Sequence, residues 1–223
     1  MMARFKLIND EQGYALDNEL SSQLPLRIDF LSNQINYRRL KGGKKELLFK
    51  AVNAKEGCHV WDCTAGLGTD SFLLAAKGCR VTLFERSTVL ALLLDQAMKT
   101  AIKDPEVGKI IQRMTLVKQD SIQALEQMSD GLSKPDVILI DPMFPSRRKS
   151  AQVKGEMQTL QKFLGKDGDA LALVKAALTT ICPKVVVKRP ANGGQLENLV
   201  PTYCLMAKAN RFDVFLNNAN EEK

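Results

Sequence analysis

A glycine-rich segment is the first place where this chain could do chemistry. Gly66 and Gly68 follow an apolar run at residues 59–63, which predicts a strand, and precede residues 70–77, which predict a helix. A strand that leads through a glycine turn into a helix brings backbone N–H groups close to a ligand. Glu85 ends the next apolar run, 17 residues after Gly68, where a carboxylate can accept hydrogen bonds from both hydroxyls of a ribose. These features predict a cofactor that contains a nucleoside.

The acidic residue Asp62 narrows the choice of cofactor. It lies four residues before Gly66, where a carboxylate would repel a pyrophosphate but can hold the ammonium group of a methionine moiety, directly or through water. Ser71 also stands where the dinucleotide fingerprint requires a third glycine. These residues favour S-adenosylmethionine over a nicotinamide dinucleotide. A nicotinamide-dependent oxidoreductase remains the alternative that would use the same turn.

A second segment whose residues could take part in a reaction, D-P-M-F-P, begins at Asp141 after an apolar run at residues 136–140. An acid, a proline and an aromatic residue at a strand end are typical of enzymes that methylate amino groups. An exocyclic amine is a poor nucleophile because its lone pair is delocalised into the ring. Asp141 and the carbonyl of Pro142 can accept its N–H groups and orient the nitrogen, while Phe144 stacks on an extruded base.

The elements that must position these residues alternate along the chain. Short apolar runs and longer helical stretches predict a doubly wound, mostly parallel α/β sheet of the Rossmann type. Strands are expected at residues 59–63, 79–84, 114–118, 136–140 and 184–188, and a closing antiparallel hairpin at 203–208 and 211–216. Helices are expected at 70–77, at 88–103 with Thr88 as the N-cap, and at 121–128, 150–164 and 169–181. Asp120 and Ser121 would then follow the third strand, within reach of an adenine amino group.

The sequence predicts one main domain with a small N-terminal extension. Residues 1–57 are less regular and predict an N-terminal extension with a helix at 44–52 and a basic segment that faces the substrate. Residues 58–223 form the expected cofactor-binding domain. With 223 residues and a 45% hydrophobic share, the chain is long and apolar enough for a globular core.

The positive charge is concentrated in two clusters. The formal net charge is +7, and residues 143–193 alone hold 10 basic and 3 acidic residues. Two basic clusters that flank a mildly acidic middle favour a polyanion such as RNA held across one face, although a charged run can also be a merely solvated surface. The expected phosphate contacts are Arg38, Arg39, Lys44, Lys45, Arg147, Arg148, Lys149, Lys154, Lys188 and Arg189. The last two are expected to follow the strand at 184–188 and to lie on the same rim, at the carboxyl end of the sheet.

The cysteines, the histidine and the apolar runs argue against a metal site, a membrane span and secretion. The five cysteines are scattered without a C-x-x-C pair, and His59 is the single histidine, so we expect reduced thiols and no metal site. The longest apolar run has six residues and the first ten residues lack an apolar core, so neither a membrane span nor a secretory signal is expected. These features predict a cytoplasmic protein whose oligomeric state stays open.

Several segments together resemble one family. They are D-C-T-A-G-L-G-T-D from Asp62, F-E-R from Phe84, D-P-M-F-P with the basic K-S-A-Q-V-K-G-E-M after it, and V-V-V-K-R-P from Val185. Together they resemble the bacterial small-subunit (16S) ribosomal RNA guanine-N2 methyltransferases of the RsmJ type. The resemblance runs from about Arg27 to Phe215.

The resemblance implies a class I methyltransferase fold and methyl transfer from S-adenosylmethionine to the N2 amine of a guanine in 16S rRNA. S-adenosylhomocysteine would be the product, and the partner would be the rRNA or the assembled 30S particle. The implied cofactor contacts are Thr69, Asp70, Glu85, Arg86, Asp120, Ser121 and Asp141. Methylation of another nucleic acid, and a non-catalytic RNA-binding module on a degenerate cofactor fold, remain the alternatives.

Overall fold

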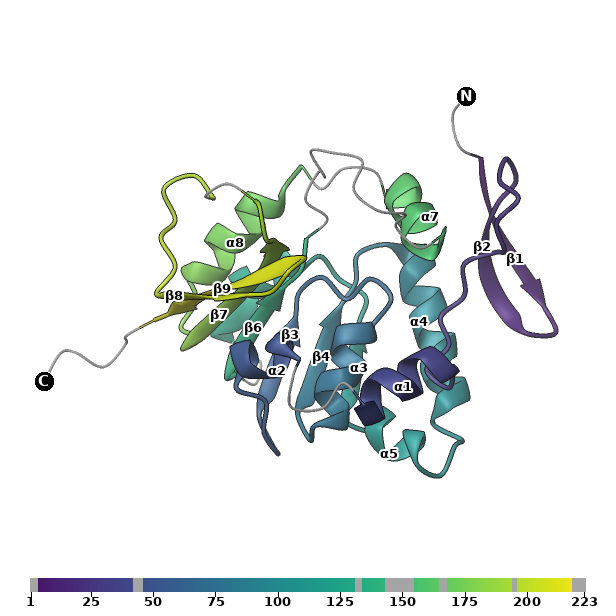
Figure 1. The fold of residues 1–223 in the computed structure, drawn as a ribbon, viewed down its shortest axis with the longest axis horizontal. Helices are drawn as coiled ribbons and strands as arrows, with labels where there is room; N and C mark the ends of the chain where they lie inside the picture. Colours follow the sequence, from purple (N-terminus) through teal and green to yellow (C-terminus); the bar gives the residue numbers. More distant parts are fainter. Residues whose placement is uncertain are drawn as a thin grey trace, which may run out of the picture.

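A central sheet of seven strands organises the molecule, with the strand order β5-β4-β3-β6-β7-β9-β8 (Figure 1). The computed structural model describes residues 4–41, 46–130, 134–142, 155–164, 168–193 and 196–217, apart from the side chains of 129–130, 155–158 and 161. The strands are β3 (His59–Asp62), β4 (Arg80–Phe84), β5 (Met114–Val117), β6 (Val137–Ile140), β7 (Lys184–Pro190), β8 (Tyr203–Met206) and β9 (Asn210–Leu216). β3 to β7 run parallel, while β9 is antiparallel to both β7 and β8. The predicted parallel sheet with a closing antiparallel hairpin is confirmed.

Helices cover both faces of this sheet. The helices that follow the N-terminal hairpin are α1 (Asn33–Lys41), α2 (Leu47–Val52), α3 (Thr69–Ala76), α4 (Thr88–Ala101), α5 (Val107–Ile111), α6 (Ser121–Glu126), α7 (Gly155–Leu164) and α8 (Ala170–Leu178), with a 3-10 turn at Gln127–Asp130. Residues of α2, α3, α4 and α5 pack into the core on one face, and residues of α6 and α8 into the core on the other. In β6, Leu139 faces the first core while Ile138 and Ile140 face the second, because successive side chains of a strand point to opposite sides.

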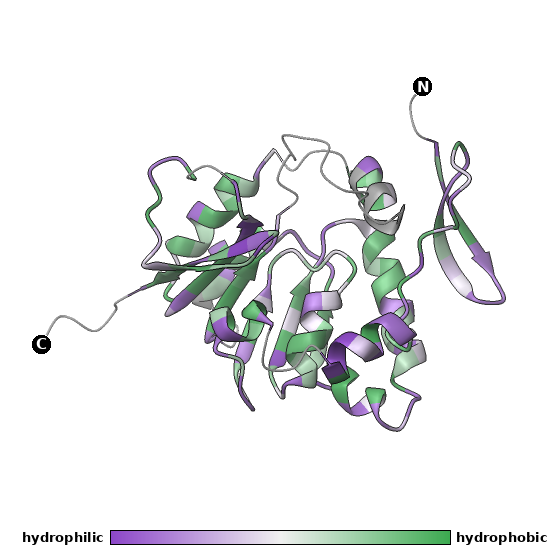
Figure 2. Cartoon of the chain, viewed as in Figure 1, coloured by the Kyte–Doolittle hydropathy of each residue, from purple (hydrophilic) through white to green (hydrophobic). Residues whose placement is uncertain are grey.

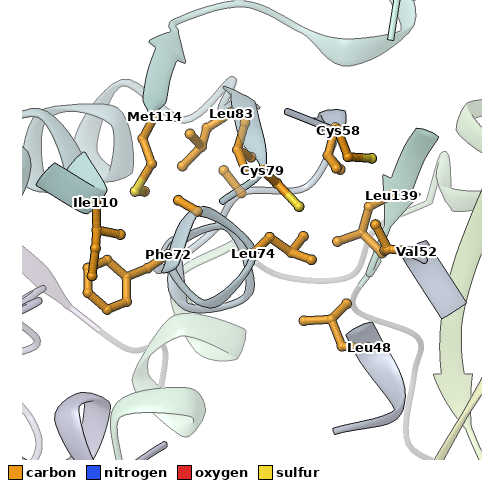
Figure 3. Packing of buried hydrophobic residues seen from close by; sticks show 14 of the residues in the cluster. Leu48, Val52, Cys58, Phe72, Leu74, Cys79, Leu83, Ile110, Met114 and Leu139 are labelled. Atoms are coloured by element: carbon orange, nitrogen blue, oxygen red, sulfur yellow. The ribbon is translucent and has the colours of Figure 1, made fainter. Parts of the chain in front are cut away.

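The larger core is built around α3. Leu74 points from this helix toward Leu139 of β6, while Phe72 points to the other side of the helix, within the same core as Leu83 of β4 (Figure 3). All four side chains are fully buried. This packing sets the position of the turn that precedes α3, because the helix cannot shift along the sheet without opening the core.

The N-terminal region packs on the sheet domain in two places. The hairpin of β1 (Phe5–Asp10) and β2 (Gly13–Asn18) lies beside α4 and α7 (Figure 1), with Phe5 in edge-on contact with Phe163 at 5.3 Å between ring centres. Helix α2 instead contributes Leu48 and Val52 to the larger core. The sequence did not predict α1, which buries no residue and is mostly hydrophilic (Figure 2). Amphipathic periodicity is the signal that such a helix lacks.

Several element boundaries differ from the sequence prediction. Ser87, rather than Thr88, caps α4 by accepting a hydrogen bond from the N–H of Leu90. The short helix α5 was not predicted, and β7 extends as far as Pro190 because it pairs with β9 along its whole length. Within the described part of the chain, no helix is long and apolar enough to cross a membrane.

Candidate functional site

The glycine turn joins β3 to α3 at the carboxyl end of the sheet. Gly66 and Gly68 have φ angles of +53° and +70°, a conformation that side chains other than glycine rarely adopt. Asp62 supports the turn from below, since its carboxylate accepts hydrogen bonds from the N–H of Thr64 at 3.1 Å and from the hydroxyl of Ser71 at 2.5 Å. Its carboxyl group is buried, and burial raises its pKa to about 6, against the opposing effect of the two hydrogen bonds.

Glu85 connects the end of β4 to this turn. One carboxylate oxygen accepts the N–H of Gly66 at 3.0 Å, and the other accepts the N–H of Ser87 at 2.7 Å. These bonds hold the carboxylate in one orientation beside the turn. A carboxylate has about four lone-pair positions, so its two oxygens together can accept more than these two backbone hydrogen bonds.

Asp120 and Ser121 lie at the start of α6, after β5. One oxygen of Asp120 accepts the N–H of Ile122 at 2.9 Å, and the other lies 3.4 Å from the guanidinium of Arg86. Ser121 donates its hydroxyl to the carbonyl of Cys63 in the glycine turn. Arg86 also forms an ion pair with Asp169, the residue before α8. The ends of β3, β4 and β5 are therefore tied to one another by polar contacts.

Asp141 follows β6 at the centre of the same edge. Its N–H donates to the hydroxyl of Thr64 at 2.6 Å, and its carboxylate lies 2.6 Å from the ammonium of Lys188. Its side chain is 38% exposed, more than the side chains of Asp120 at 27% and Asp70 at 16%. Partial removal from water raises the pKa of Asp141, and the Lys188 ammonium opposes that rise.

These residues enclose a cleft of about 260 Å³. Seven of its lining residues were predicted from the sequence as site residues, namely Gly66, Glu85, Arg86, Asp120, Ser121, Asp141 and Pro142. Three predicted cofactor contacts do not line it: Asp62 lies beneath the turn, Thr69 begins α3, and Asp70 bonds to Lys188. Phe144 lies outside the described residues.

Other residues of the cleft wall were not predicted from the sequence. Among them are Thr64, Ser87, Asp169 and the apolar side chains Phe84, Ile122, Leu164 and Leu173. The position of Asp169 at the start of a helix could have been found from the sequence, because an acidic residue often stands directly before a helix. No local pattern indicated its contact with Arg86, since the two residues are 83 positions apart in the chain.

Two of the predicted RNA contacts, both in α1, form ion pairs with acidic side chains of this chain instead. Arg38 pairs with Glu46 at 3.2 Å, and Arg39 pairs with Glu106 at 3.3 Å. The other basic residues of that prediction, Lys44, Lys45, Arg147, Arg148, Lys149 and Lys154, lie outside the described residues.

The predictions for Lys188 and Arg189 need correction. Both lie inside β7 rather than after it, opposite Phe212 and Arg211 of β9. Arg189 is buried and donates to Asp213 at 2.8 Å, so it is not on an open rim. Lys188 points to Asp70 and Asp141 at the floor of the site.

The residues around the cleft fit S-adenosylmethionine. Glu85 and Asp120 bring carboxylate oxygens, the acceptors that hydroxyl and amino groups require, and Phe84, Ile122 and Leu173 bring apolar surface of the kind that an adenine ring packs on. The cleft also lies at the carboxyl ends of parallel strands, where doubly wound sheets bind their ligands.

Comparisons with known proteins agree with this geometry. Residues 2–217 match the family described as "Putative SAM-dependent methyltransferase". A protein of Shewanella amazonensis named "Ribosomal RNA small subunit methyltransferase J" is 41% identical over 222 residues, covering 97% of this chain and 88% of its own length. A protein of Neisseria meningitidis with the same name is 42% identical over 208 residues, covering 93% and 82%.

A solved structure extends the likeness to three dimensions. The SAM-dependent methyltransferase of Neisseria gonorrhoeae superposes with a TM-score of 0.77 at 32% identity, covering 96% of this chain and 84% of that one. The family match, over residues 2–217, includes both the glycine turn and the strand ends that form the cleft. The chain therefore belongs to the S-adenosylmethionine-dependent methyltransferases, in the family of the ribosomal RNA small subunit methyltransferases J.

Proposed function

We propose that this protein transfers the methyl group of S-adenosylmethionine to the exocyclic N2 amine of a guanine in 16S rRNA. The observation that carries the proposal is the position of Asp141, a partly exposed carboxylate that lines the same cleft as Glu85 and Asp120. A hydrogen-bond acceptor for an amine thus stands beside the groups suited to a nucleoside. The names of the relatives supply the class of RNA.

Residues at the ends of successive strands would hold successive parts of the cofactor. Glu85 would accept the ribose hydroxyls, Asp120 would accept the adenine amine, and Ile122 would pack on the ring. Asp62 would act indirectly, by holding the Thr64 N–H and Ser71 and so the shape of the turn. Bound S-adenosylmethionine supplies an electrophilic methyl carbon on a sulfonium, so the proposed reaction needs no metal.

The protein's part in the reaction is alignment. Asp141 would accept an N–H of the guanine amine, with the carbonyl of Pro142 as a second acceptor, and so turn the nitrogen lone pair toward the methyl carbon. Fixing this orientation before the transition state is a large source of rate enhancement. Phe144 would stack on the guanine after it leaves the RNA helix.

The basic segments would hold the RNA backbone. Arg147, Arg148, Lys149 and Lys154 follow the D-P-M-F-P segment, and Lys44 and Lys45 follow α1. Cationic side chains on either side of a cleft position a nucleic acid without reading its sequence. This substrate would place the activity in the cytoplasm, on free 16S rRNA or on the assembled particle.

The test is a comparison of 16S rRNA from a strain that lacks the gene with rRNA from its parent. Nucleoside mass spectrometry should show the loss of one N2-methylguanosine, and the purified chain should restore it with S-adenosylmethionine. Asp141→Asn should abolish most of the restoration, whereas Asp95→Asn, a carboxylate change on the surface of α4, should not. Unchanged nucleosides in the deletion strain would refute the proposal.

Calorimetry separates the rival classes. S-adenosylhomocysteine should bind and NAD should not. Binding of NAD alone would indicate an oxidoreductase, and binding of neither would indicate an RNA-binding module without catalysis.

A further inference from the structure

Lys188 connects three elements at the floor of the cleft. Its ammonium lies 2.6 Å from Oδ2 of Asp141, after β6, and 2.7 Å from Oδ2 of Asp70, in the first turn of α3. The Lys188 side chain is only 21% exposed. A lysine that reaches for RNA phosphates would extend into water, so this lysine serves the site from inside.

The register of the sheet creates this arrangement. β6 and β7 run parallel side by side (Figure 1), and Ile140 pairs with Val187. Asp141 and Lys188 are the next residues on the two strands, so their side chains leave the sheet on the same side. A shift of one residue would turn Lys188 to the opposite face. The pair is thus built into the strands and does not depend on a mobile surface side chain.

The charges around Lys188 show why it cannot act as a base. Burial lowers its pKa, but the carboxylates of Asp70 and Asp141 raise it further, so that the pKa lies above that of an ordinary lysine. The side chain therefore stays an ammonium under all working conditions. Its remaining means of acting is to hold the two carboxylates apart and in place.

We propose that Lys188 is a positioning residue for methyl transfer, which binds one oxygen of Asp141 and thereby aims the carboxylate at the amine of the substrate. The inference rests on the proposed function, because it assigns Asp141 to the amine. With Oδ2 held by the ammonium, the carboxylate has one rotational setting instead of several. A carboxylate that turned freely would present its oxygens to the amine in only a fraction of encounters.

A second contact holds the ammonium itself. Asp70 is fixed at the start of α3 and accepts from Lys188, and on its other oxygen it lies 3.8 Å from Arg38 of α1. Arg38 in turn pairs with Glu46. Lys188 is therefore anchored from the side of α3 and cannot follow Asp141 if that carboxylate turns.

The test compares three lysine variants in single-turnover methylation of 30S particles from the deletion strain. Lys188→Met removes the charge at similar length, and Lys188→Arg keeps the charge. Lys175→Met is the matched control, because Lys175 forms a 2.9 Å ion pair with Glu197 on the surface of α8. We expect Lys188→Met to lower kcat by about 10- to 100-fold, the scale of a misplaced reacting group. KM for RNA and the Kd for S-adenosylhomocysteine should change by less than about threefold.

The pH profile provides a readout that a merely structural residue would not move. Among the residues that the structure describes, the charged groups near Asp141 are Asp62 of β3, Asp70 of α3 and Lys188 of β7, with Arg38 of α1 beyond Asp70. Without the ammonium, the carboxylates around Asp141 raise its pKa, so the acid limb of kcat should move to higher pH in Lys188→Met. Lys188→Arg should keep the acid limb near its parental position and restore much of kcat.

Unfolding measurements test the pair without RNA or cofactor. A double-mutant cycle of Lys188→Met and Asp141→Asn in urea should show that the two changes are not additive. If Lys188→Met fails to fold, Lys188→Met with Asp70→Asn removes the second carboxylate as well and takes its place in every assay.

Three results have distinct meanings. A folded Lys188→Met protein with the parental kcat would overturn the inference. A raised KM for RNA with a weaker salt dependence would also overturn it, in favour of a phosphate contact. Failure of the parental chain to methylate rRNA would instead refute the proposed function.

Discussion

At the scale of single residues, the carboxylates in and beneath the cleft differ in their access to water. Asp62 accepts two hydrogen bonds beneath the glycine turn, Glu85 accepts two backbone N–H groups at the cleft wall, and the side chain of Asp141 is 38% exposed. A buried carboxylate serves the backbone that it binds, while an exposed one can meet a ligand. Acidic side chains in this one site can therefore have different roles: a buried one supports the backbone of the turn, and an exposed one is open to a ligand.

Glu85 should control cofactor affinity. We predict that Glu85→Ala weakens the binding of S-adenosylmethionine by about 1.5–3 kcal/mol, the usual contribution of hydrogen bonds to a charged group. Isothermal titration measures the change, with Glu126→Ala on the exposed side of α6 as the control. Parental affinity in a folded Glu85→Ala protein would exclude this residue from the binding site.

Asp62 should make stability depend on pH. Its pKa in the folded protein, about 6, lies above its ordinary value of 3.8, so the folded state binds more protons between these two values. The contribution of Asp62 is therefore complete below about pH 4 and is lost as the pH rises through 6. Relative to Asp62→Asn, the parental protein should lose about 2–3 kcal/mol across this window, at 1.36 kcal/mol per pKa unit.

Urea unfolding at pH 4, 5, 6 and 7 measures this difference. Asn keeps an acceptor for the Thr64 N–H, and the Ser71 hydroxyl can turn to accept from its amide. A constant difference between the two proteins across the four pH values would show that Asp62 titrates normally.

At the scale of elements, the tight passage from the glycine turn into α3 sets the shape of the cleft floor. Gly68 is the N-cap of α3 and packs against Leu94 and Phe30. A Cβ at this position would lie 2.7 Å from Leu94 Cδ2 and 3.1 Å from the Phe30 ring. The turn therefore depends on glycine both for its backbone conformation and for space.

Two glycine variants separate these causes. Gly57 has a φ of +75°, close to the +70° of Gly68, but a Cβ there would meet nothing within 4 Å. Gly57→Ala should cost about 1–2 kcal/mol from the left-handed backbone alone. Gly68→Ala should cost about 2–5 kcal/mol because overpacking adds to that strain. Equal losses in denaturant unfolding would show that space around Gly68 is not limiting.

At the scale of the whole molecule, the parallel sheet brings distant polar residues to one edge. Gly66, Glu85, Asp120 and Asp141 follow four different strands, yet all line the same cleft. The hairpin of β1 and β2 lies on the α4 and α7 side of the molecule (Figure 1), and the antiparallel pair β8 and β9 closes the opposite side of the sheet.

The net charge of +7 should appear in the salt dependence of RNA binding. Replacing Arg147, Arg148 and Lys149 together by alanine should flatten the plot of log K against log salt concentration by about 2–3, at 0.7–0.9 per lost phosphate contact. The matched control exchanges Arg for Lys and Lys for Arg at the same positions and should keep the parental slope. An unchanged slope in the alanine variant would assign this cluster to a solvated surface.

Local patterns in the sequence were sufficient to predict the parallel strands, the glycine turn and the carboxylates Glu85, Asp120 and Asp141 at the strand ends. Each of these features has a short-range signal, because a buried strand is apolar and a left-handed turn needs glycine. In a parallel sheet, residues at the carboxyl ends of strands must then share one edge.

Only the tertiary structure decided the partners of the charged residues. The sequence placed Lys188 and Arg189 on an RNA-binding rim, whereas pairing with β9 extends their strand and turns them toward Asp141 and Asp213. The ion pair of Arg86 with Asp169 was not predictable from the sequence either. Such contacts join residues far apart in the chain and depend on strand register and burial, which leave no local pattern in the sequence because any surface lysine or arginine looks the same there.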